Sequence, residues 1–258
     1  PMVITIHDMI DERFHQGQAA YENIISLRAK HINQANKIIA VSENTRKDLI
    51  ELCGVDPNKI ETIYHGNSFN TNIERATLPQ LFEQPYLLYT GKRYAYKNFD
   101  RLVQSLIPIM QANPDLYLVC AGGGAFKNAE LTQLKTLHLN HRVIYQPIHD
   151  NEQLASLYNH AQCLVYPSLY EGFGLPIIEA FACGCPVITS KGSSTAEIAG
   201  DAAVLIDPNN TDDMTEKIRE VFNNSSLQNQ LVQLGHNRAH LFNWDKTANQ
   251  TLKLYQAI

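Results

Sequence analysis

The chain has 258 residues, of which 44% are hydrophobic and 18% are charged. This length lies between one large domain and two smaller ones, and the composition is typical of a globular protein with a substantial core. The net charge of −5, with no long basic cluster in the sequence, argues against a nucleic-acid-binding surface, which needs a basic stripe.

The sequence also argues against a disulfide framework and a membrane-spanning helix. Its five cysteines are an odd number, and Cys120, Cys163 and Cys183 lie inside apolar runs, which is typical of buried thiols in a reducing compartment. Cys183-Gly184-Cys185 lacks the two-residue spacing of a redox or zinc motif. No uninterrupted apolar run reaches the ~18 residues of a spanning helix.

The first section of the chain alternates short β-branched runs with longer amphipathic stretches. Strands are predicted at residues 2–6, 37–42 and 59–66, with a helix over about 21–36. A second helix is predicted after Ser42, a good N-cap. We expect residues 1–66 to form part of an N-terminal α/β domain, and the polar residues 67–84, which have no clear period, to connect two domains.

From Tyr86 the alternation becomes regular. Six apolar strand candidates are separated by helix-length segments, which predicts a parallel sheet covered on both faces. They are residues 86–91, 116–124, 142–147, 163–168, 186–190 and 202–207.

The predicted fold class is therefore α/β, with two Rossmann-like, doubly wound domains of which the first is incomplete. Residues 85–240 form the second domain, and residues 241–258 form a terminal helix that packs back toward the first. Trp244, Leu252 and Tyr255 are the apolar residues of that helix that we expect to dock on a neighbour. Because open parallel sheets bind ligands at the carboxyl ends of their strands, the functional residues should follow the strands.

The stretch LVYPSLYEGFGLPIIEAFACGCPVITS, residues 164–190, carries two acids and a glycine turn between a predicted strand and a predicted helix. Gly172 and Gly174 permit a close backbone approach, and Pro176 suits a first helical turn, whose free amides attract anions. Glu171 precedes this helix and is placed to accept hydrogen bonds from sugar hydroxyls. Glu179 lies one turn in, where a carboxylate either stabilises the helix end or chelates a vicinal diol such as a ribose.

A basic loop, TGKRYAYKN, follows the first strand of the second domain. Gly91 opens the loop, and Lys92, Arg93 and Lys97 supply its positive charges. These charges form either a solvated surface loop or a clamp for a diphosphate, which a guanidinium binds as a planar fork and an ammonium as a compact charge. The nearby helix start at the same sheet edge favours the clamp.

A third strand ends in Gly122-Gly123-Gly124, which does not match the dinucleotide-binding glycine pattern and disfavours a dehydrogenase. The glycines fit a close approach of backbone to a ligand. His7 ends the first strand, where an imidazole has either a structural role or a bond to a phosphate or sugar hydroxyl. His65 ends another strand and is a weaker candidate.

These residues resemble the retaining GT-B glycosyltransferases with an E-x7-E motif (glycosyl transferases group 1), many of which are bacterial mannosyl- and glucosyltransferases. The resemblance runs along nearly the whole chain, through TIHDMI, IIAVSENTRKDL, YLLYTGKRYAYKN, residues 142–190, GDAAVLIDP and the closing FNW. The acids Glu171 and Glu179 form its most specific motif.

Carried over to this sequence, the resemblance implies a nucleotide-sugar site built from strand-end residues. His7, Arg93, Lys97 and Glu171 would be catalytic, with Arg93 and Lys97 on the diphosphate and Glu171 on the donor sugar. Glu179 would bind the ribose. The remaining donor contacts would come from Gly91, Lys92, Gly122, Gly123, the base-packing turn Pro147-Ile148, and the loop of Gly172, Phe173, Gly174 and Leu175.

The same resemblance implies the reaction. A hexose would pass with retention from GDP-mannose or a UDP-hexose to a saccharide or lipid-linked acceptor in polysaccharide or lipopolysaccharide biosynthesis, without a metal or other cofactor. The leaving diphosphate would be stabilised electrostatically. The implied location is cytoplasmic, with room for peripheral contact on the inner face of the membrane.

One departure from the family pattern bears on activity. Family members carry a further portion before the segment that matches VITIHD, including a strand and a glycine-rich loop near the acceptor. We therefore expect a fragment or truncated product that binds nucleoside diphosphate but transfers sugar poorly. Two alternatives stay open: a nucleotide-sugar 2-epimerase of the same fold, and a non-catalytic nucleotide-binding partner.

Overall fold

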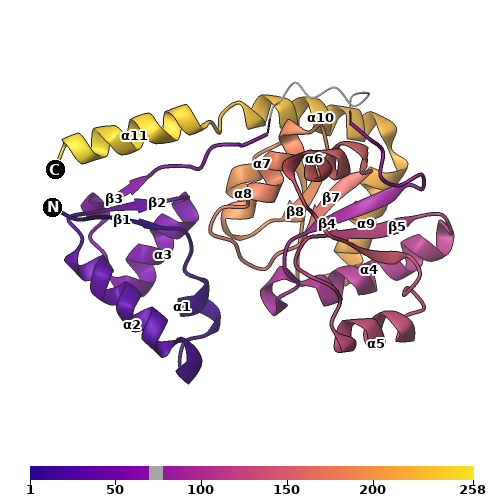
Figure 1. The fold of residues 1–258 in the computed structure, drawn as a ribbon, viewed down its shortest axis with the longest axis horizontal. Coiled ribbons are helices and arrows are strands. Elements are labelled where there is room, and N and C mark those ends of the chain that lie inside the picture. The colour runs from indigo at the N-terminus through magenta and orange to yellow at the C-terminus, as the bar shows by residue number, and fades with distance from the viewer. Residues whose placement is uncertain (70–77) are drawn as a thin grey trace.

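The computed structural model describes residues 1–69 and 78–258, which form two α/β units, each built on a parallel sheet (Figure 1). The predicted connection, residues 67–84, is described only in part, because residues 70–77 lie outside the described residues.

The N-terminal unit has a three-stranded parallel sheet in the order β1-β2-β3. Ile38 is aligned with Ile4 on one side and with Ile60 on the other. The strands are β1 (Val3–Ile6), β2 (Lys37–Ala40) and β3 (Ile60–Thr62), and the helices are α1 (Ile10–Phe14), α2 (Ala19–Gln34), α3 (Glu43–Cys53) and the 3₁₀ turn η1 (Pro57–Lys59).

The N-cap predicted at Ser42 is confirmed. Its side-chain oxygen accepts a hydrogen bond from the Thr45 amide at 3.0 Å, which satisfies one of the free amides that begin α3. Gly54 ends the helix in the left-handed conformation at φ +63°, which a glycine adopts without steric cost. The short helix α1 has no counterpart among the predicted elements.

All six strand candidates of the second unit are confirmed, in one parallel sheet of order β6-β5-β4-β7-β8-β9. The chain order reverses between β4 and β7, so the switch point of the sheet lies between those two strands. The strands are β4 (Tyr86–Thr90), β5 (Tyr117–Ala121), β6 (Val143–Gln146), β7 (Cys163–Tyr166), β8 (Val187–Ser190) and β9 (Ala203–Ile206).

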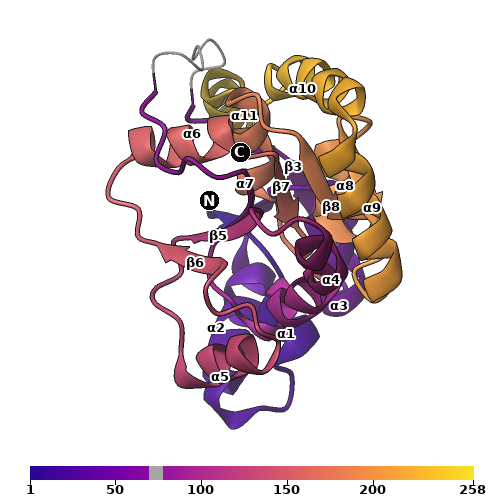
Figure 2. The same ribbon diagram turned by 90° about the vertical axis from the view of Figure 1, so that its right-hand side faces the viewer.

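Helices cover both faces of this sheet (Figure 2). Successive strand residues alternate between two cores: Leu88 and Leu164 face α6, α7 and α8, whereas Leu87 and Val165 face α4, α5 and α9. Burial on both faces explains why these strands are continuous apolar runs. The helices are η3 (Ala95–Lys97), α4 (Phe99–Ala112), α5 (Asn128–Thr136), α6 (Asn151–His160), α7 (Leu175–Ala182), α8 (Ser193–Ala199), α9 (Thr211–Asn223), α10 (Ser225–Ala239) and α11 (Trp244–Gln256).

The last helix, α11, extends from the second unit back over the first (Figure 1). Leu254 packs there with Ile39 and Ile63. The expectation that Leu252 and Tyr255 dock is wrong: both are exposed, because the face of α11 that carries Leu254 is the one turned to the sheet. Trp244 is also partly exposed, although its indole N–H donates to the Ser68 hydroxyl at 3.1 Å.

Candidate active site

A cavity of about 290 Å³ opens where strand-end loops of the two units meet. From the N-terminal unit it receives residues after β1 and β3, and from the second unit residues after β4, the end of β7, and the loop that leads into α7. Its lining residues are His7, Asp8, Ile10, His65, Thr90, Gly91, Lys97, Tyr166, Glu171, Gly172, Phe173, Gly174, Leu175 and Pro176. The strand-end placement that the sequence predicted is therefore observed.

An ion pair between Lys97 and Glu171 occupies this cavity. The Lys97 Nζ donates to Glu171 Oε1 at 2.6 Å and to the Tyr166 hydroxyl at 3.1 Å. Both charged side chains are largely buried, at 14% and 9% exposed. Burial, with the Glu171 charge adding to it, raises the pKa of Tyr166 well above its ordinary value, so this phenol stays neutral. Among the described lining residues Lys97 is the one lysine or arginine, and its charge is balanced by one carboxylate.

The start of α7 brings backbone amides to the same cavity. Gly174 has φ +108°, a conformation that a residue with a side chain rarely adopts, and it turns the chain from the loop into the helix. Pro176 stands in the first turn, as predicted. The positive end of the helix dipole and the ammonium of Lys97 therefore both border the cavity, where each attracts an anion.

Gly172 lies in close contact with the N-terminal unit. A Cβ at this position would lie 1.8 Å from the His7 carbonyl oxygen, which no rearrangement of a side chain relieves. The Gly172 carbonyl in turn accepts hydrogen bonds from the hydroxyls of Ser42 at 2.6 Å and Thr45 at 3.1 Å, at the start of α3. The glycine is thus required for contact between the units, a reason that the sequence pattern did not give.

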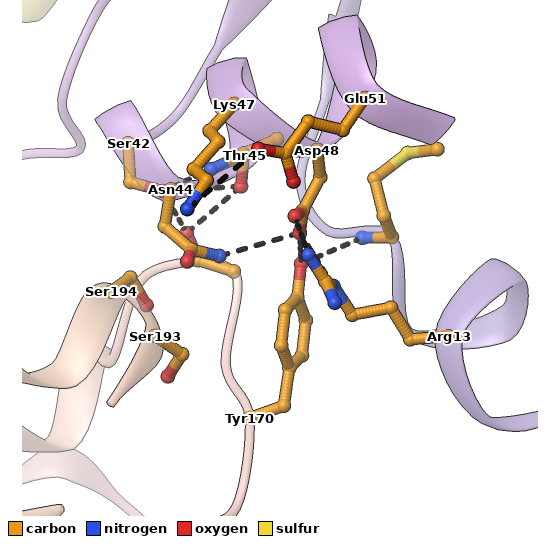
Figure 3. A network of polar contacts seen from close by, with 12 residues as sticks. Arg13, Ser42, Asn44, Thr45, Lys47, Asp48, Glu51, Tyr170, Ser193 and Ser194 are labelled. Atoms are coloured by element: carbon orange, nitrogen blue, oxygen red, sulfur yellow. Dashed lines mark hydrogen bonds and ion pairs between the residues drawn. The ribbon is translucent and has the colours of Figure 1, made fainter. Parts of the chain in front are cut away.

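A buried polar network beside this contact joins the loop of Glu171 to the N-terminal unit (Figure 3). The Tyr170 hydroxyl donates to the carboxylate of Asp48, which also accepts two hydrogen bonds from the guanidinium of Arg13. The Asp48 side chain is fully buried. The Met9 amide donates to the Tyr170 hydroxyl at 3.4 Å. Burial and the hydrogen bond to Asp48 raise the pKa of Tyr170, so it remains a donor.

Sequence reasoning missed this network, because Tyr170 and Asp48 are 122 residues apart and no pattern pairs them. Its one sequence signal is that Asp48 falls within the helix predicted after Ser42, whose buried residues in the structure are Thr45, Asp48 and Leu49.

Two histidines lie together on the N-terminal side of the cavity. The rings of His7 and His65 stack with centroids 5.3 Å apart, and their Nδ1 and Nε2 atoms are 3.3 Å apart. Burial and then the neighbouring His7 lower the pKa of His65 to about 4. His65 is therefore a neutral imidazole near pH 7. From the sequence, His65 is a weaker candidate for a site residue than His7, but in the structure both line the cavity.

Arg93 is not among the residues that line this cavity, and its predicted contact with a diphosphate stays a prediction. Its Nε donates to Glu130 at 2.7 Å and its Nη2 donates to the carbonyl oxygens of Gly124 and Ala125 at 2.8 and 3.0 Å. The guanidinium also lies 4.7 Å from the ring centre of Phe126. Through these partners Arg93 joins the loop after β4 to the loop after β5 and to α5.

Glu179 is also directed away from the cavity lining. It follows the first turn of α7, and its Oε2 accepts a hydrogen bond from the Tyr158 hydroxyl of α6 at 2.8 Å. Burial raises its pKa. The alternative in which Glu179 stabilises the helix start is not supported, because α7 has no acid in its first turn. A ribose contact would require the carboxylate to share or exchange its Tyr158 partner.

The predicted site residues therefore fall into two groups, according to whether they line this cavity. Those that line the cavity are His7, Gly91, Lys97, Glu171, Gly172, Phe173, Gly174 and Leu175. Those that do not are Lys92, Arg93, Gly122, Gly123, Pro147, Ile148 and Glu179. Gly123 has a packing role, since a Cβ there would lie 2.3 Å from the Gly91 carbonyl oxygen. Ile148 packs against the core on the α6–α7 side of the sheet.

Comparison with family models gives two matches that cover almost all of the chain. Residues 71–238 match the family described as glycosyl transferases group 1, and residues 1–68 match glycosyltransferase family 4. The chain belongs to the group 1 glycosyltransferase family. The resemblance read from the E-x7-E segment is thereby confirmed at the level of the family.

Relatives and solved structures match most or all of this chain. The O-antigen chain mannosyltransferase B of Escherichia coli is 31% identical over an alignment of 237 residues that covers 88% of this chain and 62% of that protein. The Anabaena protein HepE, solved with UDP-glucose, matches with a TM-score of 0.85 at 18% identity over 100% of this chain and 72% of its own. The sucrose-phosphate synthase of Thermosynechococcus elongatus matches with a TM-score of 0.80 at 23% identity over 99% of this chain and 67% of its own.

These matches show the GT-B fold that the sequence predicted, in which two Rossmann-like units face each other. The chain spans about three fifths of the length of the Escherichia coli relative.

Proposed function

We propose that this chain carries the nucleotide-sugar site of a retaining glycosyltransferase and that the 290 Å³ cavity receives the diphosphate and the donor sugar. The observation that carries the proposal is the convergence of the Lys97–Glu171 ion pair and the start of α7 at the switch point of the sheet. Family membership supports it, since the proteins of this family are glycosyltransferases.

Lys97 and the amides at the start of α7 act on the diphosphate in this proposal. Both are positive groups held in place before a ligand arrives, so they stabilise the charge that develops on the leaving diphosphate without reorganising. Arg93 is paired with Glu130, so among the side chains Lys97 is the one that stabilises the negative charge of the diphosphate in this proposal. The Tyr166 hydroxyl accepts a hydrogen bond from the Lys97 ammonium and so helps to fix its position.

Glu171 and His7 act on the sugar. When the diphosphate binds Lys97, the Glu171 carboxylate is free to accept hydrogen bonds from sugar hydroxyls. His7 lines the same cavity from the N-terminal unit. The anomeric carbon loses its bond to the phosphate oxygen and gains a bond to an acceptor hydroxyl on the same face. The hydroxyl proton leaves with the departing diphosphate.

For the donor, we propose GDP-mannose or a UDP-hexose. The mannosyltransferase among the relatives supports the first, and the UDP-glucose bound to HepE supports the second. For the acceptor we propose a saccharide or a lipid-linked saccharide. In the described part of the chain, no helix is both long and apolar enough to cross a membrane.

The proposal is tested by titrating GDP, UDP and ADP into the protein by calorimetry. Lys97→Met should weaken the binding of the preferred diphosphate by about tenfold or more, because a charge-assisted hydrogen bond contributes about 1.5–3 kcal/mol. The matched control is Lys191→Met, a lysine that also follows a strand and pairs with an acid, but lies outside the cavity. Equal losses in the two variants would contradict the proposal.

Incubating the protein with donor alone separates transfer from the epimerase alternative, because an epimerase converts the donor without any acceptor. Binding of diphosphate with neither transfer nor epimerisation, when acceptors of several kinds are supplied, would support the non-catalytic nucleotide-binding alternative.

A further inference from the structure

A second and larger cavity, of about 680 Å³, adjoins the proposed donor cavity. One wall comes from α1 and the start of α2 in the N-terminal unit, and the other from η3 and the loop before it in the second unit. Asp8 and Ile10 line both cavities. A ligand in the larger space therefore lies next to whatever occupies the smaller one.

Aromatic rings from both units form much of the wall. Phe14 of α1 stacks on Tyr96 with ring centres 5.9 Å apart, and Tyr94 lies 5.9 Å from Tyr96. Phe14 is 39% exposed and Tyr94 is 46% exposed, and both line the cavity, so a ligand there can reach these two rings. The electron-rich faces of aromatic rings attract the slightly positive C–H groups that a sugar ring presents on its apolar face.

The one guanidinium among the described lining residues, that of Arg28, is already paired with carboxylates, whereas Lys92 and Lys97 lie against the rings of Tyr94 and Tyr96 without lining the cavity. Arg28 donates to Glu12 at 2.6 Å and to Asp11 at 2.9 Å, so two carboxylates saturate one guanidinium. The Asp11 carboxylate also lies 3.3 Å from the ring nitrogen of His15. Among the described lining residues Arg28 is the one lysine or arginine, and Asp8 carries a further negative charge. An anionic ligand would meet net negative charge, whereas neutral hydroxyl groups would meet carboxylate acceptors.

We infer that this cavity binds the terminal sugar of a neutral glycan acceptor, with the ring stacked on the Phe14, Tyr94 and Tyr96 wall and the reacting hydroxyl directed past Asp8 into the donor cavity. The inference rests on the proposed function. It excludes acceptors that present a phosphate or a carboxylate in this space. In the transfer step the acceptor oxygen forms the new bond to the anomeric carbon, the anomeric carbon–phosphate oxygen bond breaks, and the nucleoside diphosphate leaves with the electron pair and the hydroxyl proton.

The test measures sugar binding by saturation-transfer NMR, with the preferred nucleoside diphosphate present. The probes are methyl α-D-mannopyranoside, which is neutral, and mannose 6-phosphate, which has the same ring with a charge. The neutral probe should give a signal at least fivefold stronger than the phosphate. In Tyr94→Ala and Phe14→Ala that signal should fall at least fivefold, while the dissociation constant of the diphosphate changes less than twofold. The matched control is Tyr255→Ala, which removes a similarly exposed ring (55%) from α11.

A second variant tests the charge argument separately. Asp11→Asn leaves Arg28 with one carboxylate partner, so the signal of mannose 6-phosphate should rise at least threefold relative to the neutral probe. Diphosphate binding without any signal from the neutral probe would overturn the inference and leave the proposed function standing. Loss of diphosphate binding in the unmodified protein would overturn the proposed function itself. Equal signals from the two probes would refute the selection against charge.

Discussion

Replacing Glu171 by glutamine should separate the two effects of its carboxylate, which neutralises Lys97 in the free protein and repels a diphosphate. Glu171→Gln keeps the shape of the side chain but replaces the carboxylate that accepts from the Lys97 ammonium at 2.6 Å by a neutral amide. Breaking a buried pair in this way costs about 3–5 kcal/mol, and because both side chains keep some exposure we expect a loss of about 2–3 kcal/mol in the free energy of unfolding.

The affinity for a nucleoside diphosphate should change in the opposite direction. At a separation of about 6 Å and an effective dielectric constant of about 20–40, two unit charges repel by about 1.4–2.8 kcal/mol. Removing the carboxylate should therefore tighten the binding of GDP or UDP by about tenfold, which corresponds to ~1.4 kcal/mol. The sugar is left out of this measurement because Glu171 is also proposed to bind it.

Glu130→Gln is the matched control. Glu130 pairs with Arg93 at 2.7 Å and is similarly buried, but neither residue lines the cavity. Urea denaturation should show a loss of stability in both variants, whereas calorimetry should show tighter diphosphate binding in Glu171→Gln alone. Weaker binding in Glu171→Gln would refute this account of the cavity, and tighter binding in Glu130→Gln would show that Arg93 reaches the ligand after all.

Three further predictions concern the contact between the units and its histidines. Tyr170→Phe removes a hydrogen bond to the buried charge of Asp48 and should lower the free energy of unfolding by about 1.5–3 kcal/mol. The matched control Tyr86→Phe removes a hydrogen bond to the neutral Leu157 carbonyl and should cost about 0.5–1.5 kcal/mol. Urea denaturation measures both losses, and equal losses would refute the special role of Asp48. Gly172→Ala should separate the units and increase hydrogen exchange at the start of α3, whereas Gly192→Ala, which has open space for a Cβ, should not; unchanged exchange would contradict the close approach. Because the pKa of His65 is lowered to about 4, the unfolded chain binds a proton that the folded protein does not between about pH 6.5 and pH 4, so stability should fall as the pH is lowered through this range; His65→Gln should flatten the profile, and an unchanged slope would refute the assignment.

Much of the fold could be predicted because its signals are local. The six strands of the second unit are buried on both faces, so each is a continuous apolar run that the sequence displays directly. The cap at Ser42 depends on an amide three residues away. The parallel order of the sheet then brings the ends of β4 and β7 to one edge, which is why Lys97 and Glu171 could be expected to meet.

The sequence by itself thus determined which loops approach one another, because burial period and strand polarity are properties of short segments. Only the tertiary structure decided which side chain in each loop points to the cavity. Lys97 and Arg93 are equally basic in the sequence, but Arg93 is held by Glu130, 37 residues away. Glu179 likewise turns to Tyr158, and Tyr170 to Asp48. Side-chain direction depends on such long-range partners and on the glycine turns that aim the loops, and neither is encoded in the period of a sequence.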